Sequence, residues 1–217
     1  MNTKLIILIA FAIVGSTLQQ APNPKPAAWA NNWMAKFNDT SYYFLQGNRT
    51  VSGTFKYQND GTNKRMRISR SNGRNDRYCG TVFPFSNTPC DMLIVNSNRY
   101  LIFQEKNYCC KCCTSAQGCG VITQDWAANA TFEGASADKN TNYFLIKGLQ
   151  NNWYWQTADG KPSKIYMEPV SDMVFDTSSY STTPLNDADF AKPDSNSFGD
   201  CEKSCPFLST CTLVKFA

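Results

Sequence analysis

The sequence predicts an all-β protein with little helix, built from antiparallel strands and stapled by disulfides. Two observations carry this prediction. Short apolar or alternating runs are separated by turn sequences rich in Asn, Asp and Gly at regular intervals, which is typical of hairpins. The chain also holds ten cysteines, an even number. We therefore expect one disulfide-linked β domain.

The N-terminus predicts secretion. Lys4 precedes an unbroken apolar run over residues 5–14, and Gly15 begins a short stretch of small residues. A span needs roughly 20 apolar residues, so a cleaved signal peptide over residues 1–19 fits better than a transmembrane segment. Residues 20–217 then form a single domain. We expect a protein without a transmembrane segment, secreted to the extracellular space or held in the lumen of the secretory and lysosomal pathway.

The first predicted hairpin joins residues 50–58 and 64–70. In the first strand Val51, Gly53, Phe55 and Tyr57 share one side. In the second strand Met66 and Ile68 share one face, and Arg65 and Arg67 share the other. Asp60-Gly61 supplies the turn between them.

Later strands are predicted around residues 92–95, 100–103, 130–136, 142–150 and 152–157. Several of them carry apolar residues on both faces, as in "MLIV", "YLIF", "YFLI" and "WYW". Such runs indicate either burial on both sides or a sheet that lines an apolar cavity, and periodicity alone leaves both readings open. Short helices are expected only near residues 27–37 and 178–190.

The cysteines predict disulfides rather than a metal or redox centre. An oxidising compartment favours disulfide formation between cysteines. The chain has no histidine, which is the residue that completes a mixed cysteine–histidine zinc site. Adjacent cysteines should reach different partners, because a bridge between neighbours is strained. The predicted disulfide residues are Cys79, Cys90, Cys109, Cys110, Cys112, Cys113 and Cys119, with Cys201, Cys205 and Cys211 in the tail. A cysteine-rich loop (109–119) and a cysteine-containing tail (201–211) are thus expected to be tied together, and the pairing stays open.

Net charge and glycosylation motifs limit the kinds of partner that the sequence predicts. A formal net charge of +4 is too small to indicate nucleic acid or an anionic membrane. Three sequons predict glycosylation at Asn38, Asn48 and Asn129.

Enzyme activity is not expected. Without histidine the chain has no Ser-His or Cys-His pair, and it has no Gly-rich phosphate loop. The carboxylates of Asp172, Asp176, Asp187 and Asp189 could supply a glycosidase pair, but a solvated acidic loop explains them better. Whether the chain binds a metal is not decided by the sequence.

Residues 50–170 resemble the ependymin-related family. The stretches that carry the resemblance are 51–70, with its Arg-x-Arg strand, 91–110, where a "YLI" hairpin leads into cysteine, and 130–170. The late matching positions are Trp126, Asn129, Phe132, Gly134 and Pro169. The chain departs from the family pattern at Met167, where members carry a cysteine, and in its extra cysteine pairs. Disulfide pairing, ligand identity and lysosomal targeting are therefore not carried over.

The resemblance implies a fold and a function. Members of the family fold as two antiparallel sheets that form an open cup or half-barrel around a hydrophobic cavity, and they are secreted or lysosomal glycoproteins. It implies binding of a lipid or other hydrophobic small molecule, and a carrier of this kind is expected to be a monomer or homodimer. No cofactor is expected, and calcium binding is implied by the resemblance alone.

Period 2 along the apolar strands selects candidates for the ligand pocket. They are Met92, Ile94, Leu101, Phe103, Phe144, Ile146, Trp153 and Trp155. A shift of one residue would select the opposite face. The alternative function is a disulfide-rich structural or adhesive protein of an extracellular matrix or secretory granule, without a ligand.

Overall fold

The computed structural model describes residues 23–43, 47–137, 140–148, 150–206 and 209–213. The predicted signal peptide lies outside these residues. Within them, no helix is long and apolar enough to span a bilayer.

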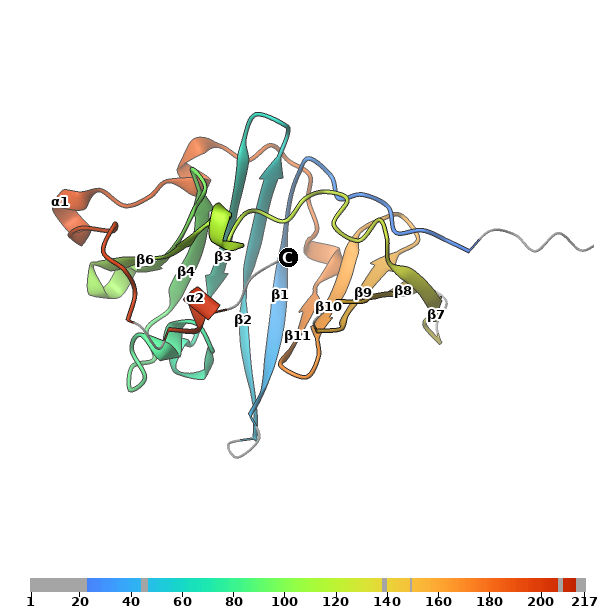
Figure 1. Ribbon diagram of the computed structural model, residues 1–217, viewed down its shortest axis with the longest axis horizontal. Coiled ribbons are helices and arrows are strands. Elements are labelled where there is room, and N and C mark those ends of the chain that lie inside the picture. Colours follow the sequence, from blue (N-terminus) through green and yellow to red (C-terminus); the bar gives the residue numbers. More distant parts are fainter. Residues whose placement is uncertain (1–22, 44–46, 138–139, 149, 207–208, 214–217) are drawn as a thin grey trace, which may run out of the picture.

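The described chain forms one antiparallel sheet of eleven strands, in the order β6-β5-β4-β3-β2-β1-β11-β10-β9-β8-β7 (Figure 1). The strands are β1 (Asn32–Tyr43), β2 (Gly47–Asn59), β3 (Lys64–Arg70), β4 (Cys90–Val95), β5 (Asn98–Phe103), β6 (Tyr108–Thr114), β7 (Thr131–Ala135), β8 (Thr141–Ile146), β9 (Asn152–Thr157), β10 (Pro162–Met167) and β11 (Ser171–Phe175). The prediction of an antiparallel all-β fold is confirmed.

The prediction of two separate sheets is wrong. Strand β1 pairs with β2 along one edge and with β11 along the other, so the two halves share one hydrogen-bonded ladder. The register sets Phe37 opposite both Gly53 and Phe175. Turn spacing predicts hairpins, but it carries no information on which distant strands pair, and the joining of the halves therefore has no signal in the sequence.

The pairing registers divide the side chains between two faces. We call inner the face that carries Trp33, Phe55 and Met92, and outer the opposite face. Inner-face residues from β4 and β5 belong to the same buried cluster as Phe144 and Tyr154 from the other half of the sheet. Because one cluster joins both halves, the sheet bends around its inner face.

The alternation predicted for the first hairpin is confirmed. On β2, Val51, Phe55 and Tyr57 are buried, and on β3 Met66 and Ile68 are buried between exposed or half-buried neighbours. Strands β4 and β5 are buried on both faces. Leu93, Tyr100 and Ile102 of the outer face pack with Phe190 and Cys201 in a second cluster. Two-sided burial thus accounts for the "MLIV" and "YLIF" runs.

Helix is scarce, as expected, but one predicted helix is wrong. Residues 32–37 begin β1, because Trp33, Ala35 and Phe37 alternate toward the inner face. Residues 178–190 hold only the 3₁₀ turns η5 (Thr177–Ser179) and η6 (Asp187–Phe190). The remaining short elements are η1 (Gly73–Asn75), η2 (Cys79–Thr81), η3 (Gln104–Lys106), η4 (Ser115–Gln117), α1 (Ser195–Phe198) and α2 (Thr210–Leu213).

The ten cysteines lie in five disulfide pairs. These are Cys79–Cys90, Cys109–Cys201, Cys110–Cys205, Cys112–Cys211 and Cys113–Cys119. Each adjacent pair reaches two different partners, as the strain argument predicts. Three of the bridges fasten the tail to β6, and five disulfides in one chain are typical of folding in an oxidising compartment.

Candidate functional site: the inner face of the sheet

Aromatic side chains fill the middle of the inner face. Trp33 stacks on Phe55 with ring centroids 4.9 Å apart, and Trp29 meets Trp33 edge-on at 5.1 Å. The ring of Trp29 also lies 5.5 Å from Trp126 and 6.4 Å from Tyr154. The aromatic cluster, as we use the term, comprises Trp29, Trp33, Phe55, Tyr57, Trp126 and Tyr154. It combines strands from both halves of the sheet.

Two connecting segments cover this cluster. Residues 23–30 lead into β1, and residues 120–130 connect the first half of the sheet to β7; both run across the inner side in Figure 1. Trp29 Nε1 donates to Tyr154 Oη at 2.9 Å, and Tyr57 Oη donates to the carbonyl of Ile122 at 2.9 Å. The two segments are joined to each other where the Trp29 amide donates to the Gln124 carbonyl at 2.9 Å.

Burial changes the acidity of the two phenols that hold these segments. It raises the pKa of Tyr57 to about 12, and it also raises the pKa of Tyr154. Both hydroxyls therefore keep their protons at neutral pH. Each can donate one hydrogen bond and accept others, and this fits the contacts they make.

Two hydrogen-bond donors of the aromatic cluster have no acceptor in the described part of the chain. The indole nitrogens of Trp33 and Trp126 are buried, and neither has an acceptor among the described residues. Both rings contact Trp29, so the two N–H groups belong to one aromatic environment. A buried donor without an acceptor costs about 1–3 kcal/mol, and native proteins contain few of them.

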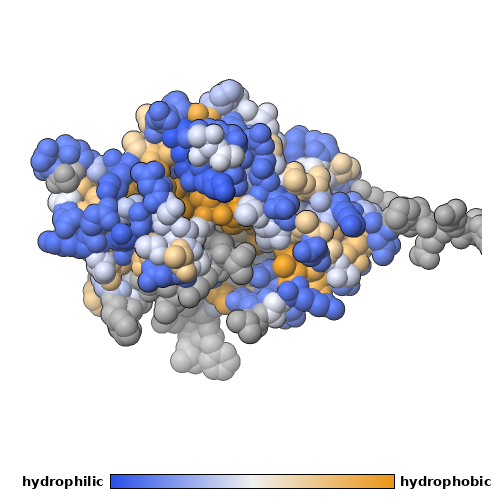
Figure 2. All heavy atoms as spheres, turned by 45° about the horizontal axis from the view of Figure 1, so that its top comes forward, coloured by the Kyte–Doolittle hydropathy of each residue, from blue (hydrophilic) through white to orange (hydrophobic). Residues whose placement is uncertain are grey.

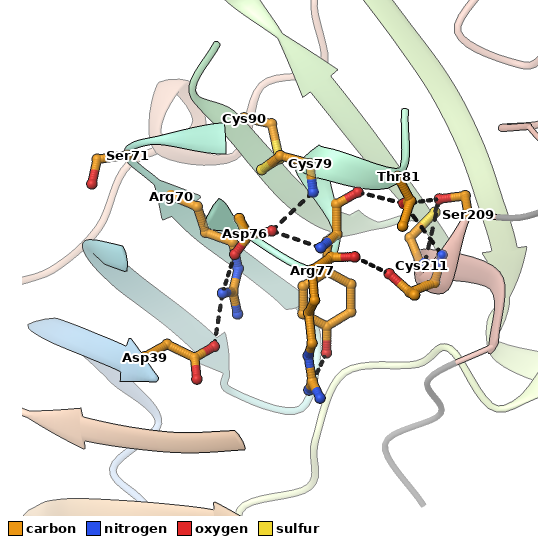
Figure 3. The surroundings of a disulfide bond; sticks show 12 residues. Asp39, Arg70, Ser71, Asp76, Arg77, Cys79, Thr81, Cys90, Ser209 and Cys211 are labelled. Atoms are coloured by element: carbon orange, nitrogen blue, oxygen red, sulfur yellow. Dashed lines mark hydrogen bonds and ion pairs between the residues drawn. A yellow bond between two sulfur atoms is a disulfide. The ribbon is translucent and has the colours of Figure 1, made fainter. Parts of the chain in front are cut away.

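A buried ion cluster lies at one end of the inner face (Figure 3). Arg70 Nη1 donates to Asp39 Oδ2 at 2.8 Å and to Asp76 Oδ2 at 2.7 Å. Asp76 Oδ1 accepts from the amides of Tyr78 and Cys79 at 2.7 and 2.8 Å. Burial disfavours the Arg70 cation, but the two carboxylates outweigh it and raise the pKa of Arg70. This cluster ties β1 and β3 to the loop closed by the first disulfide.

Next to the ion cluster lie further buried polar groups. Arg77 is only 7 % exposed, and its Nη2 contacts Tyr78 Oη at 2.7 Å and Met167 Sδ at 3.6 Å. Asp39 Oδ1, Ser171 Oγ and Arg77 Nε have no hydrogen-bond partner among the described residues. The inner face therefore has an aromatic middle and a polar end.

The structure brings together most of the predicted pocket residues. Met92, Ile94, Leu101, Phe103 and Phe144 are at most 1 % exposed and share the inner face, and Ile146 packs partly buried against them. Whether any of them contacts a ligand stays a prediction.

Trp153 and Trp155 lie on the outer face instead. The register sets Tyr154 opposite Phe144, so Tyr154 takes the inward position on β9 and the two tryptophans point outward. The sequence prediction chose the wrong face because "WYW" is three consecutive aromatic residues, and such a run has no alternation that shows which residues point inward. Trp155 stacks with Tyr143 at 6.0 Å, and the Lys164 ammonium lies 4.7 Å from its ring centroid.

Two hollows are open to the surface. One, of about 470 Å³, lies over the central strands and is lined by Lys36, Phe37, Asn38, Ser52, Gly53, Thr54, Ser71, Val174, Phe175 and Asp176. The other, of about 430 Å³, is lined by Arg49, Asn72, Arg74, Asn75, Phe85 and Asn87. Neither is lined by a predicted pocket residue. Because residues 23–30 and 120–130 cover the aromatic cluster, a ligand there would have to displace these segments.

The charged residues singled out from the sequence have structural contacts. Arg65 Nη1 meets Asp187 at 2.7 Å, Arg67 pairs with Asp91, and Lys56 meets Asp189 at 2.6 Å. Lys164 meets Asp172 at 2.9 Å, and Asp176 caps η5 by accepting from the Ser178 amide. Arg65 and Lys56 thus hold the C-terminal segment on the outer face.

The remaining sequence predictions concern modification and metals. Asn38, Asn48 and Asn129 are exposed, and their glycosylation stays a prediction. Two groups of potential metal ligands converge, Asp76 with Cys79 and Cys90, and Cys112 with Cys205 and Cys211. Every cysteine in them is in a disulfide, and the thiolate is the form that binds metals.

Sequence reasoning missed the residues that build the middle of this site. Trp29, Trp33 and Trp126 were not among the candidates, although the alternation of Trp33, Ala35 and Phe37 was a readable strand signal. The ion pair of Arg70 with Asp39 had no local signal, because Asp39 is distant in sequence.

The chain matches no protein-family model and no curated protein. Membership of the ependymin-related family therefore stays a prediction. Among solved structures it is distantly similar to an uncharacterized conserved protein from Thermus thermophilus, with a TM-score of 0.47, 11% identity, and coverage of 77% of this chain and 88% of that one. A LolA superfamily protein from Nitrosomonas europaea has a TM-score of 0.36, 8% identity, and coverage of 75% and 90%. Likenesses this distant carry no argument about function.

Proposed function

We propose that the protein binds an apolar ligand with a hydrogen-bond acceptor, between the inner face and the two covering segments. The observation that carries this proposal is the pair of buried indole N–H groups on Trp33 and Trp126, which lack acceptors among the described residues inside an aromatic cluster. Ligand sites in proteins are mostly apolar, with a few polar groups that set orientation. A carbonyl or carboxylate on the ligand would supply the missing acceptor.

The energetics favour an amphipathic molecule over a plain hydrocarbon. Each methylene moved from water into the aromatic cluster contributes about 0.8 kcal/mol. Satisfying a buried donor adds about 0.5–1.5 kcal/mol, and association removes about 4 kcal/mol or more. An acyl chain of ~12 methylenes therefore leaves enough for micromolar affinity.

Entry requires the covering segments to move. Figure 2 shows apolar residues at the floor of a hollow near the middle of the molecule, surrounded by hydrophilic ones. Residues 23–30 are joined to β9 through the side chain of Gln156, which exchanges hydrogen bonds of 2.8 and 2.9 Å with the backbone of Ala27. A few such contacts can break together, and this would open the cluster without unfolding the sheet.

The test is to delipidate the secreted protein and titrate it with cis-parinaric acid, alongside native mass spectrometry before and after organic extraction. We expect saturable binding. Trp126→Phe replaces the indole by a smaller aromatic ring and removes one donor, so it should weaken binding about 2- to 12-fold. Trp153→Phe on the outer face is the matched control and should change affinity little. A protein with no extractable lipid and no saturable probe binding would contradict the proposal.

One observation favours the alternative of a structural or adhesive protein. The aromatic rings of Tyr143, Trp153 and Trp155 stand on the outer face and belong to neither core cluster. Aromatic residues left on a sheet face suit association with a second copy of the chain. This alternative predicts concentration-dependent assembly in sedimentation that Trp153→Thr abolishes, with no dependence on lipid.

A further inference from the structure

The hollow of about 430 Å³ is independent of the aromatic cluster. It lies where the start of β2 meets the loop after β3 and the loop closed by Cys79–Cys90. Its lining residues are Arg49, Asn72, Arg74, Asn75, Phe85 and Asn87. Its volume is within the range of small-molecule sites, about 300–1,000 Å³.

The backbone around this hollow is held rigidly. A Cβ on Gly73 would collide with the carbonyl oxygen of Thr88, so the two loops touch backbone to backbone and only glycine fits. The Cys79–Cys90 disulfide and the carboxylate of Asp76 fasten the same loops from behind (Figure 3). The backbone positions from which the lining side chains project are therefore fixed before any ligand arrives, and this lowers the entropic cost of binding.

The lining of the hollow holds two guanidinium groups and no carboxylate. Arg49 Nη1 donates to the carbonyl of Arg74 at 3.3 Å, which brings the two residues together. Arg74 is exposed and forms no ion pair within the described part of the chain. Guanidinium groups bind carboxylate and sulfate through paired N–H donors.

The remaining lining residues supply neutral recognition groups. The side-chain amides of Asn72, Asn75 and Asn87 make no hydrogen bond among the described residues, so their donors and acceptors face solvent. Phe85 is 95 % exposed, although the loop that carries it is closed by a disulfide. Phe83, two residues earlier in the chain, packs against Phe103 with ring centroids 4.8 Å apart. The exposure of Phe85 is therefore not shared by the other phenylalanine of this loop.

We propose that this hollow binds a carboxylated or sulfated saccharide. The two arginines would bind the anionic substituents, the asparagine amides would bind ring hydroxyls, and Phe85 would lie against the apolar face of a sugar ring. An anionic bilayer fits less well, because a bilayer surface favours several inserted apolar side chains and this hollow offers one ring among polar amides.

The predicted glycan at Asn48 does not obstruct this site. The register pairs Asn48 with Tyr42, whose hydroxyl points to Asp172 on the outer face. Arg49 is the next residue along the strand and so faces the opposite side. A glycan on Asn48 would leave the hollow open.

The experiment is a calorimetric titration of the full secreted protein with a heparin-derived tetrasaccharide, with chitotetraose as the neutral probe. Saturable binding of the sulfated probe is expected, and little of the neutral one. Arg74→Gln should weaken it about tenfold or more, and Phe85→Ser about two- to tenfold. The matched control is Lys64→Gln, which removes an exposed charge at the other end of the hairpin that β2 forms with β3 and should change affinity less than about twofold.

Several results would overturn the proposal. Equal weakening by Arg74→Gln and Lys64→Gln would show non-specific charge attraction. If the tetrasaccharide does not bind saturably to a protein that has a native near-UV circular dichroism spectrum, the hollow is not a saccharide site. Binding to phosphatidylserine vesicles without binding to the tetrasaccharide would assign the hollow to a membrane surface.

Discussion

On its outer face, the half of the sheet formed by β3–β6 is covered by the chain itself, whereas the half formed by β8–β11 has no such cover among the described residues. Leu93, Tyr100 and Ile102 are at most 3 % exposed beneath Phe190 and Cys201. On the other half, Val174 is 44 % exposed.

The difference shows how this protein stabilises a wide sheet that bends around one core. A strand buried on both faces needs a second layer, and the C-terminal segment supplies it over β4 and β5. That segment has little secondary structure of its own. Disulfides and ion pairs from Arg65 and Lys56 therefore hold it in place. On the uncovered half, the buried apolar side chains of the described strands lie on the inner face.

The largest effect is expected at Phe190, which lies under the Arg65 guanidinium at 4.7 Å and is 2 % exposed. Phe190→Ala should lower the free energy of unfolding by about 3–5 kcal/mol, because it leaves a cavity over β4 and β5. Urea denaturation of the oxidised protein measures this. A change below about 1 kcal/mol would show that the C-terminal segment contributes little to the covered half.

Removal of the Cys109–Cys201 bridge should come next. The double variant Cys109→Ser/Cys201→Ser should cost about 2 kcal/mol, near the low end for a lost native disulfide, because the neighbouring Cys110–Cys205 bridge still closes the same long loop. We also expect faster hydrogen exchange in residues 185–205 than in β8–β11. Uniform loss of protection across both halves would contradict the idea that this bridge acts on one half of the outer face.

A matched pair of small substitutions sharpens the comparison. Ile102→Val on the covered half should cost about 0.5–1.5 kcal/mol, since Ile102 is fully buried. Val174→Thr on the uncovered half should stay within about 0.5 kcal/mol of the parent. Similar costs at the two sites, measured by thermal unfolding, would mean that the uncovered half is shielded in solution.

Acid should loosen the covered half first. Hydrogen bonds from Lys192, Tyr100 and Lys111 lower the pKa of Glu202 to about 2 from an ordinary 4.5. A lowered folded-state pKa adds stability that is present above pH 4.5 and is lost as pH falls toward 2. Hydrogen exchange in residues 185–205 should therefore accelerate within this window, and Glu202→Gln should flatten the response. An unchanged pH profile in that variant would exclude Glu202 as the cause.

Much of the fold could be predicted locally. The alternation of β2 and β3, the Asp60-Gly61 turn and the hairpin of β4 and β5 were all readable, because each depends on neighbours in sequence. The pairing of β1 with β11 was not, since it joins residues more than a hundred positions apart and no turn signal marks it. This pairing makes one sheet out of the predicted two.

The site was predictable only where alternation was clear. Met92, Leu101 and Phe144 share a face as expected. In "WYW" no alternation shows which residues point inward, and the prediction therefore assigned Trp153 and Trp155 to the wrong face. The covering segments were unpredictable, because Trp29 and Trp126 lie in irregular chain whose position depends on tertiary contacts. Two-sided burial of β4 and β5 likewise required knowledge of where the C-terminal segment lies.

The two edges of the sheet are closed to other chains by different means. Along β6, the tail forms a parallel bridge at Lys111 and Ser204. The Lys111 amide donates to the Lys203 carbonyl at 2.8 Å, the Cys205 amide donates to the Lys111 carbonyl at 2.9 Å, and the Cys110–Cys205 disulfide holds the tail there. Along β7, a bulge at Gly134 interrupts the edge. The first protection depends on oxidation and the second does not. If reduction released the tail, β6 would become an unpaired edge open to another chain, so the protection of this edge is a property of the compartment as much as of the sequence.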